Sequence, residues 1–291
     1  MKTRLAIFVF TLLLLPFAGA WLGDTGWDST VSDDASALAA TSVAALALAC
    51  LLLLSNLGVV LRTGNNPLQL QRRYFLAVAG ASAVLGWLLV YLNQYTASAA
   101  SGLSFAPAQL LFSTLLFALL APTALSLRAF FGSFAGMLRR LARGPVLPML
   151  ADDTLVFLLS PLAIAGLLGG AAWPEQLSWL LWLAPLLLLG TLQLLWQEST
   201  IFAGLKYGDW GRVVHVALSG LIVCNLAVWS YDYAGGNFNL YLPGWLAQLG
   251  YALFGLLALQ LGDVVAENWR GKSRGEIFKR KPFPIPVTTR K

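Results

Sequence analysis

Apolar residues along this chain come in long unbroken runs, and polar residues are confined to the gaps between them. A helix needs about 20 consecutive apolar residues to cross a bilayer, and the pattern predicts about eight such spans. They cover residues 5–22, 36–61, 74–92, 107–127, 154–172, 178–196, 213–231 and 243–262. The expected fold class is therefore an all-α, polytopic transmembrane helical bundle.

The first apolar run has two interpretations. Lys2 and Arg4 precede it, and Pro16 and the small residues 18–20 follow its apolar middle. A secretory signal peptide has the same order of features. If residues 1–20 are cleaved, seven spans remain and the mature N-terminus lies outside. The other spans keep their orientation in either case.

Two further segments differ from the spans. In residues 129–143, apolar side chains recur at helical spacing with Arg139, Arg140 and Arg143 between them, which predicts an interfacial amphipathic helix on the inner membrane surface. Residues 263–291 form a basic tail that contains Pro282 and Pro284. We expect this tail to lie in the cytoplasm.

The basic residues fix an orientation. Threading the spans alternately places all 19 Lys and Arg residues in gaps on one side. Lys and Arg collect in the cytoplasmic loops of membrane proteins, so the pattern predicts that both termini are cytoplasmic. The expected location is the cytoplasmic (inner) membrane, with multiple passes.

Composition excludes several classes of protein. Hydrophobic residues make up 58% of the chain and charged residues 11%, whereas soluble domains carry about 25% charged residues. The net charge of +6 comes from residues that flank the spans, where they meet anionic lipid headgroups. We therefore expect membrane lipids as partners and no nucleic acid.

Residues suited to cofactors are scarce. Cys50 and Cys224 both fall inside apolar spans, and the chain has no CxxC motif. His215 is the only histidine, which excludes paired-histidine haem ligation within the chain. No cofactor, metal site or catalytic residue is evident, and the sequence favours a protein that is not an enzyme.

One polar face stands out at the inner end of the last span. Gln260, Asp263 and Glu267 follow each other at helical spacing. Acids there could bind a cation or the metal-bound diphosphate of a lipid substrate. The alternative is that they pair with Arg270 and Arg274, about one turn later.

Other polar candidates lie in spans six and seven. Gln193 and Glu198 are near the inner end of span six, where an acid could serve as a proton or cation site or lie solvated at the helix end. His215 could gate protons or bond to a carbonyl. Asn225 lies deeper, where an amide more often joins helices than binds a substrate.

Three functions remain open. The first is a non-catalytic membrane subunit or scaffold, with protein partners bound through the tail or through helix faces. The second is a small-solute or ion-coupled transporter, because Pro122, Pro161 and Pro185 interrupt three consecutive spans and broken helices build transporter sites. The third is an enzyme that acts on a lipid-linked substrate at the cytoplasmic face.

Overall fold

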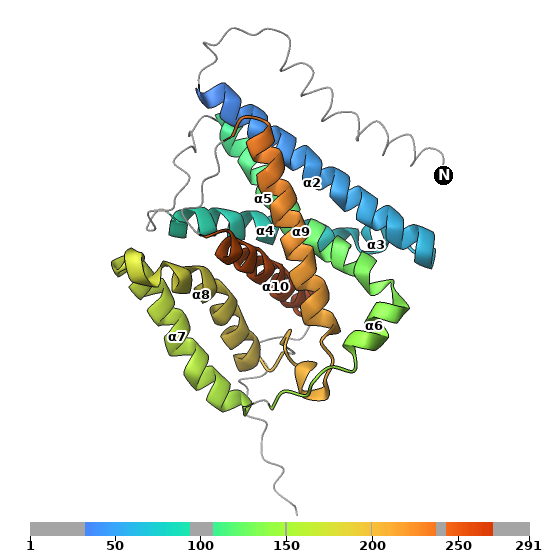
Figure 1. Ribbon diagram of the computed structural model, residues 1–291, viewed down its shortest axis with the longest axis vertical. Coiled ribbons are helices and arrows are strands. Elements are labelled where there is room, and N and C mark those ends of the chain that lie inside the picture. Colours follow the sequence, from blue (N-terminus) through green and yellow to red (C-terminus); the bar gives the residue numbers. More distant parts are fainter. Residues whose placement is uncertain (1–32, 94–106, 149, 199, 237–242, 270–291) are drawn as a thin grey trace, which may run out of the picture.

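The computed structural model describes residues 33–93, 107–148, 150–198, 200–236 and 243–269. Within these ranges every regular element is a helix (Figure 1). The elements are α2 Asp33–Thr63, α3 Pro67–Leu70, α4 Arg72–Asn93, α5 Pro107–Gly132, α6 Ala135–Leu141, α7 Asp152–Ala172, α8 Pro174–Leu195, the 3₁₀ helix η1 Leu205–Tyr207, α9 Gly211–Tyr233 and α10 Gly244–Trp269.

Six of these helices are long and apolar enough to cross a membrane: α2, α4, α5, α7, α9 and α10. The apolar part of α8 is shorter and covers Trp179–Leu195. The expected first span, residues 5–22, lies outside the described residues. The all-helical class and the multi-pass character expected from the sequence are therefore confirmed at this level, by length and composition.

Two of the long helices begin at a proline. Pro107 and Pro174 are the first residues of α5 and α8. Proline is well tolerated there because the first N–H groups of a helix have no partner inside the helix. The interior prolines Pro122, Pro161 and Pro185 do not divide their helices, since α5, α7 and α8 each continue through them. The expected interruptions are thus absent from these three helices.

Hydrogen bonds between side chains show the relative direction of α2 and α5. Thr41 donates to Gln109 at 3.3 Å, and Ser55 donates to Ser126 at 2.9 Å. Later residues of α2 meet later residues of α5, so the two helices are parallel. Alternate threading requires this result for spans two and four.

Neighbouring helices in the chain run antiparallel. The hydroxyl of Ser82 on α4 donates to the carbonyl of Phe117 on α5 at 2.6 Å, and the Trp87 indole donates to Thr114 at 3.0 Å. α9 and α10 are antiparallel as well, and so are α7 and α8. In Figure 1, α7 and α8 lie together at lower left, and α10 lies between α8 and α9.

Glycines bring the antiparallel helices α7 and α8 close together. A Cβ atom on Gly166 would lie 2.9 Å from the carbonyl oxygen of Leu180, and one on Gly170 would lie 2.6 Å from the Cβ of Leu181. Close approach at small residues is the main way in which membrane helices gain packing contacts. The Gly-x-x-x-Gly spacing in α7 therefore forms its contact with α8.

The segment expected to be one amphipathic helix over residues 129–143 has a different structure. α5 continues to Gly132, and a separate short helix, α6, follows. The break falls at Ser133, whose hydroxyl bonds to the carbonyl of Phe130 at 2.6 Å. Phe134 packs against the Phe130 ring edge, and the Arg62 guanidinium lies 3.7 Å from the centre of its ring. This contact ties the start of α6 to the end of α2.

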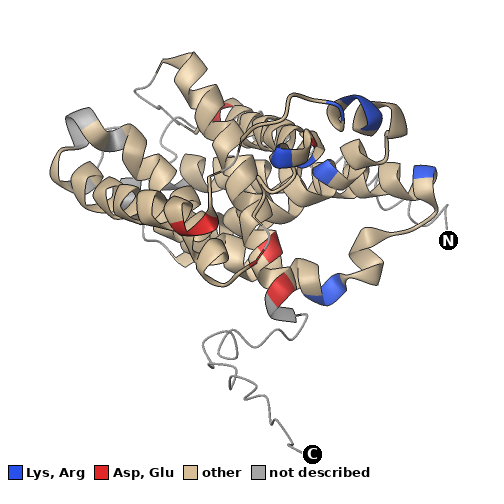
Figure 2. Cartoon of the chain, turned by 90° about the horizontal axis from the view of Figure 1, so that it is seen from below, with Lys and Arg blue, Asp and Glu red and all other residues tan. Residues whose placement is uncertain are grey.

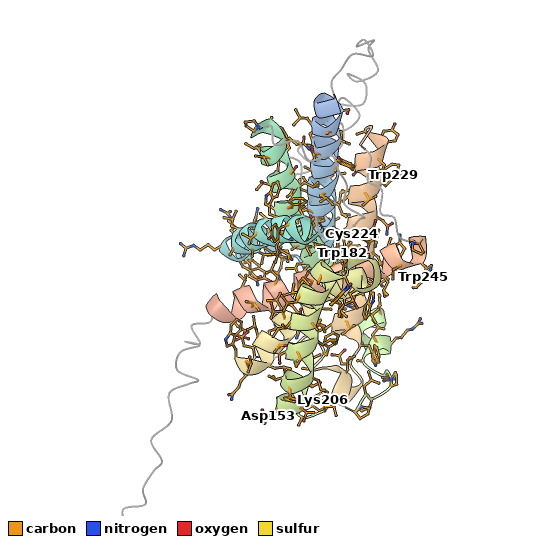
Figure 3. All side chains as sticks on the ribbon, turned by 90° about the vertical axis from the view of Figure 1, so that its left-hand side faces the viewer. Asp153, Trp182, Lys206, Cys224, Trp229 and Trp245 are labelled. Carbon is orange, nitrogen blue, oxygen red and sulfur yellow. The ribbon has the colours of Figure 1, made fainter. Side chains whose placement is uncertain are left out.

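Charge is segregated in space as well as in sequence. In Figure 2 the blue Lys and Arg residues gather on the right-hand side of the molecule, and none appears on the left-hand side. Figure 3 shows Lys206 and Asp153 at the same end of the molecule, as expected if both loops lie on one side of the membrane. We use the name basic end for the region where Arg128 near the end of α5, Arg212 at the start of α9, Asp263 near the end of α10 and Tyr74 at the start of α4 lie close together. The last turns of α8 reach this region at Gln260 of α10.

Candidate functional site

An ion pair between α9 and α10 lies at the basic end. Nη2 of Arg212 donates to Oδ2 of Asp263 at 2.6 Å, and their side chains are 33% and 23% exposed. Arg128, in the last turns of α5, is close enough to both to act on their charges. Arg270 and Arg274, the partners considered from sequence, lie outside the described residues. Asp263 instead pairs with a base from another helix.

The polar face of α10 turns into the bundle. Gln260 is 1% exposed and Glu267 is 9% exposed. Gly190 of α8 makes room for the Gln260 amide, since a Cβ there would lie 3.2 Å from Nε2. On the other side, Gly262 lies against the hydroxyl of Tyr74 on α4. Gln260 and Glu267 of the predicted face are therefore buried, whereas Asp263 between them is partly exposed.

Gln193 is buried completely at the end of α8. Its side chain is 0% exposed, and neither amide atom has a hydrogen-bond partner among the described residues. The helix ends just beyond it, because the N–H of Glu198 bonds back to the Gln193 carbonyl at 2.8 Å and Gln197 takes a left-handed φ of 54°. Glu198 is half-buried in the following loop. The Gln193 amide is thus buried without a hydrogen-bond partner among the described residues, which is energetically unfavourable.

His215 lies one turn into α9 and is 3% exposed. Its ring centre is 6.3 Å from that of Phe131 on α5. Nε2 is buried and has no hydrogen-bond partner in the part of the chain that is described. The carbonyl of His215 accepts from Ser219 at 2.7 Å.

Asn225 is separate from this group. It exchanges two hydrogen bonds with Gln248 on α10, at 2.7 and 2.8 Å, and also donates to the Leu221 carbonyl. The seven sequence candidates therefore divide. Those near the basic end are Gln193, Glu198, His215, Gln260, Asp263 and Glu267, and Asn225 stands apart nearer the other end of α9.

Two hollows accompany these groups. A pocket of about 290 Å³ at the basic end is lined by Arg128, Ala129, Gly132, Leu138, Asp209, Gly211, Arg212 and His215. A shallow groove of about 430 Å³ runs along α9 and is lined by Leu221, Ile222, Asn225, Leu226 and Trp229. Within the described ranges, no group of three or more His, Cys, Asp or Glu residues could hold a metal ion.

Sequence reasoning did not select several residues that matter here. Arg128 and Arg212 were expected only as basic residues just outside spans four and seven, and Gln248 and Gln109 were not considered. The sequence signal for both arginines was their place directly beside an apolar span, which any basic loop residue shares. Nothing in the sequence indicates that Arg212 reaches Asp263, 51 residues later.

The fold and composition define the class of the protein as an all-helical multi-pass membrane protein. No protein-family model matches the chain, and no curated protein or solved structure shows significant similarity to it. Its function therefore has to follow from the geometry of the described residues.

Proposed function

We propose that the protein is a non-catalytic membrane subunit whose helix α9 receives a transmembrane helix of a partner protein. The observation that carries this proposal is one exposed stripe on α9. Leu218, Ile222, Asn225 and Trp229 follow at i, i+4, i+7 and i+11, and the three apolar ones are exposed. The spacing is that of the a and d positions at which one helix packs into another.

The polar residue within the stripe supports a helix rather than lipid as its occupant. Asn225 lies in the groove together with Ile222 and Trp229, and its hydrogen-bonded partner Gln248 is exposed beside it. Amide groups facing hydrocarbon are costly, and side-chain amides join helices inside membranes by hydrogen bonds. A partner helix with a side-chain amide or hydroxyl at this level would complete the amide pair.

Aromatic rings continue the stripe. Trp229 stacks on Tyr233 with ring centres 5.6 Å apart, and both are exposed. Figure 3 shows Trp229 and Trp245 on the same side of the molecule, so α9 and the start of α10 form one surface. We call the surface of Leu218, Ile222, Asn225, Trp229 and Tyr233 the α9 stripe.

The two other functions have less support. Transport through broken helices was suggested by three interior prolines, and α5, α7 and α8 are continuous through them. Lipid-linked chemistry would require free acids on α10, and Asp263 is bound to Arg212. The buried amides of Gln193 and Gln260 would be compatible with a polar path, but neither residue lines the pocket at the basic end or the groove on α9.

Site-specific photo-cross-linking in native membranes tests the proposal. A photoreactive residue at Ile222 should give one discrete adduct of higher mass, whose cross-linked peptide is an apolar helix of another protein. The same residue at Ile164, an exposed position on α7, is the matched control and should give no adduct. Asn225→Leu combined with Gln248→Leu should abolish the Ile222 adduct while the protein keeps its thermal stability.

Three outcomes would contradict the proposal. An adduct with twice the mass of the chain would mean that a second copy covers the α9 stripe. A link within one chain to residues 5–22 would mean that the predicted first span covers it. Equal labelling of lipid at Ile222 and Ile164 would mean that the stripe is an ordinary lipid-facing surface.

A further inference from the structure

The proposed function does not involve the pocket at the basic end. We propose that it binds a phosphate group through Arg128, Arg212 and His215, and that Asp209 receives an ammonium group of the same ligand. The chemical class is a phosphate linked to a primary amine, as in an ethanolamine phospholipid headgroup. This inference does not depend on the α9 stripe.

The side chains around the pocket supply donors that the fold leaves unused. Nε of Arg212 and Nε2 of His215 are both buried, and neither has a hydrogen-bond partner among the described residues. Both residues line the pocket. Buried polar atoms in proteins are almost always hydrogen-bonded. A ligand oxygen between these two residues would satisfy Nε of Arg212, and also Nε2 of His215 where Nε2 carries the imidazole proton.

Charge in the pocket favours a phosphate. Two arginines line it, and the only acid in the lining is Asp209. Arg212 keeps its hydrogen bond to Asp263 through Nη2, which holds the guanidinium in place while Nε remains available. Arg128 has no ion pair with any described residue. Guanidinium groups bind phosphate oxygens through charge-assisted hydrogen bonds.

The N-terminal end of α9 adds positive electrostatic potential to the pocket. Gly211, Arg212 and His215 lie in its first turns, and the N-terminal end of a helix carries a partial positive charge. Asp209 accepts from the N–H of Gly211 at 2.9 Å through Oδ1. Asp209 is exposed and lines the same pocket, so its negatively charged carboxylate is available to an ammonium group.

The position of the pocket suits a lipid headgroup. Arg128 and Gly132 lie in the last turns of the apolar segment Pro107–Gly132, and Gly211 and His215 lie in the first turns of Gly211–Tyr233. The ends of membrane-spanning segments are at the level of the headgroups. A pocket of about 290 Å³ also lies near the size range of small-ligand sites, roughly 300 Å³ and above.

Native mass spectrometry of the full chain in mild detergent tests the phosphate site. Phosphatidylethanolamine is added to the wild type, to Arg128→Gln and to Arg140→Gln. Arg140 is exposed on α6 and does not line the pocket, so its substitution removes the same charge elsewhere. We expect Arg128→Gln to weaken binding by about tenfold or more, because a charge-assisted hydrogen bond is lost, and Arg140→Gln to bind like the wild type.

Further measurements distinguish a lipid from a soluble ligand and test the contact between Asp209 and the ammonium group. His215→Phe should weaken lipid binding as Arg128→Gln does, and this variant serves if Arg128→Gln does not fold. Asp209→Asn keeps an oxygen for the Gly211 N–H and should remove the preference for phosphatidylethanolamine over phosphatidylglycerol. Phosphoethanolamine in solution should bind more weakly than the lipid. Tighter binding of the soluble compound would support the phosphate site but assign it to a soluble ligand.

The proposal is overturned if Arg128→Gln and Arg140→Gln change lipid binding equally, since retention would then reflect general charge. It is also overturned if neither the lipid nor phosphoethanolamine binds the wild type. An unchanged lipid preference in Asp209→Asn would remove the ammonium contact from the proposal.

Discussion

Gly220 of α9 and Gly255 of α10 pack directly against each other, and the contact leaves no room for a side chain. A Cβ on Gly220 would lie 2.5 Å from the nitrogen of Gly255, and a Cβ on Gly255 would lie 3.0 Å from Cα of Gly220. Backbone atoms cannot move aside as a flexible side chain can. The position of α10, and of the polar groups on it, therefore depends on this contact.

Gly255→Ala should lower the free energy of unfolding by about 1–3 kcal/mol, because the added methyl group forces the two helices apart. Thermal unfolding in detergent measures the change. Gly250→Ala is the matched control, since a Cβ there meets nothing within 4 Å, and alanine favours the helix by about 0.5–1 kcal/mol. Equal behaviour of the two variants would contradict close packing at Gly255.

The Arg212–Asp263 pair should contribute measurably to stability. Its side chains are 33% and 23% exposed, so it is intermediate between a solvated pair, worth about 0–1 kcal/mol, and a buried pair, whose disruption costs about 3–5 kcal/mol. A double-mutant cycle with Arg212→Gln and Asp263→Asn should give a coupling energy of about 1–3 kcal/mol. A coupling energy near zero would show that the two charges act independently. Asp153→Asn, at an exposed acid, should leave stability unchanged.

Gln193→Leu should leave the protein at least as stable as the wild type. The replacement removes an amide with no hydrogen-bond partner among the described residues, and such a group costs about 1–3 kcal/mol. Ser82→Ala is the control, because the Ser82 hydroxyl is also buried but donates to the Phe117 carbonyl and accepts from the Ala121 N–H. That substitution should cost about 0.5–1.5 kcal/mol. A stability loss at Gln193 would instead mean that water or a ligand satisfies its amide.

Topology can be tested at two exposed positions of a variant in which Cys50 and Cys224 are replaced by alanine. Trp173 lies between α7 and α8, and Tyr207 lies at the end of η1. In intact cells, a cysteine at position 173 should react with an impermeant thiol reagent and one at 207 should not, because the distribution of basic residues predicts that η1 lies on the cytoplasmic side. Reaction at 207 but not at 173 would reverse the orientation.

Some features of the molecule could be predicted from the sequence because they depend on the chain locally. Each of the long helices α2, α4, α5, α7, α8, α9 and α10 overlaps an expected apolar run, since about 20 apolar residues in bilayer hydrocarbon must satisfy their own backbone hydrogen bonds. Pro107 and Pro174 begin α5 and α8 for a similarly local reason. The spacing of Gln260, Asp263 and Glu267 correctly indicated one face of one helix.

The tertiary structure decides which residues contact the α10 face of Gln260, Asp263 and Glu267. Asp263 lies beside Arg212 because Gly220 and Gly255 allow α9 and α10 to approach, and the sequence carries no signal for which helices become neighbours. The break at Ser133 arises from a local hydrogen bond to Phe130, although the apolar spacing alone suggested one helix.

The sequence by itself thus determined the all-helical class and the approximate position of the long apolar helices, because hydrophobicity acts on each segment separately. The tertiary structure decided which polar groups lie close together. Arg128, Arg212, His215 and Asp209 come from two helices and a loop, and they line one pocket only because α5 and α9 pack side by side.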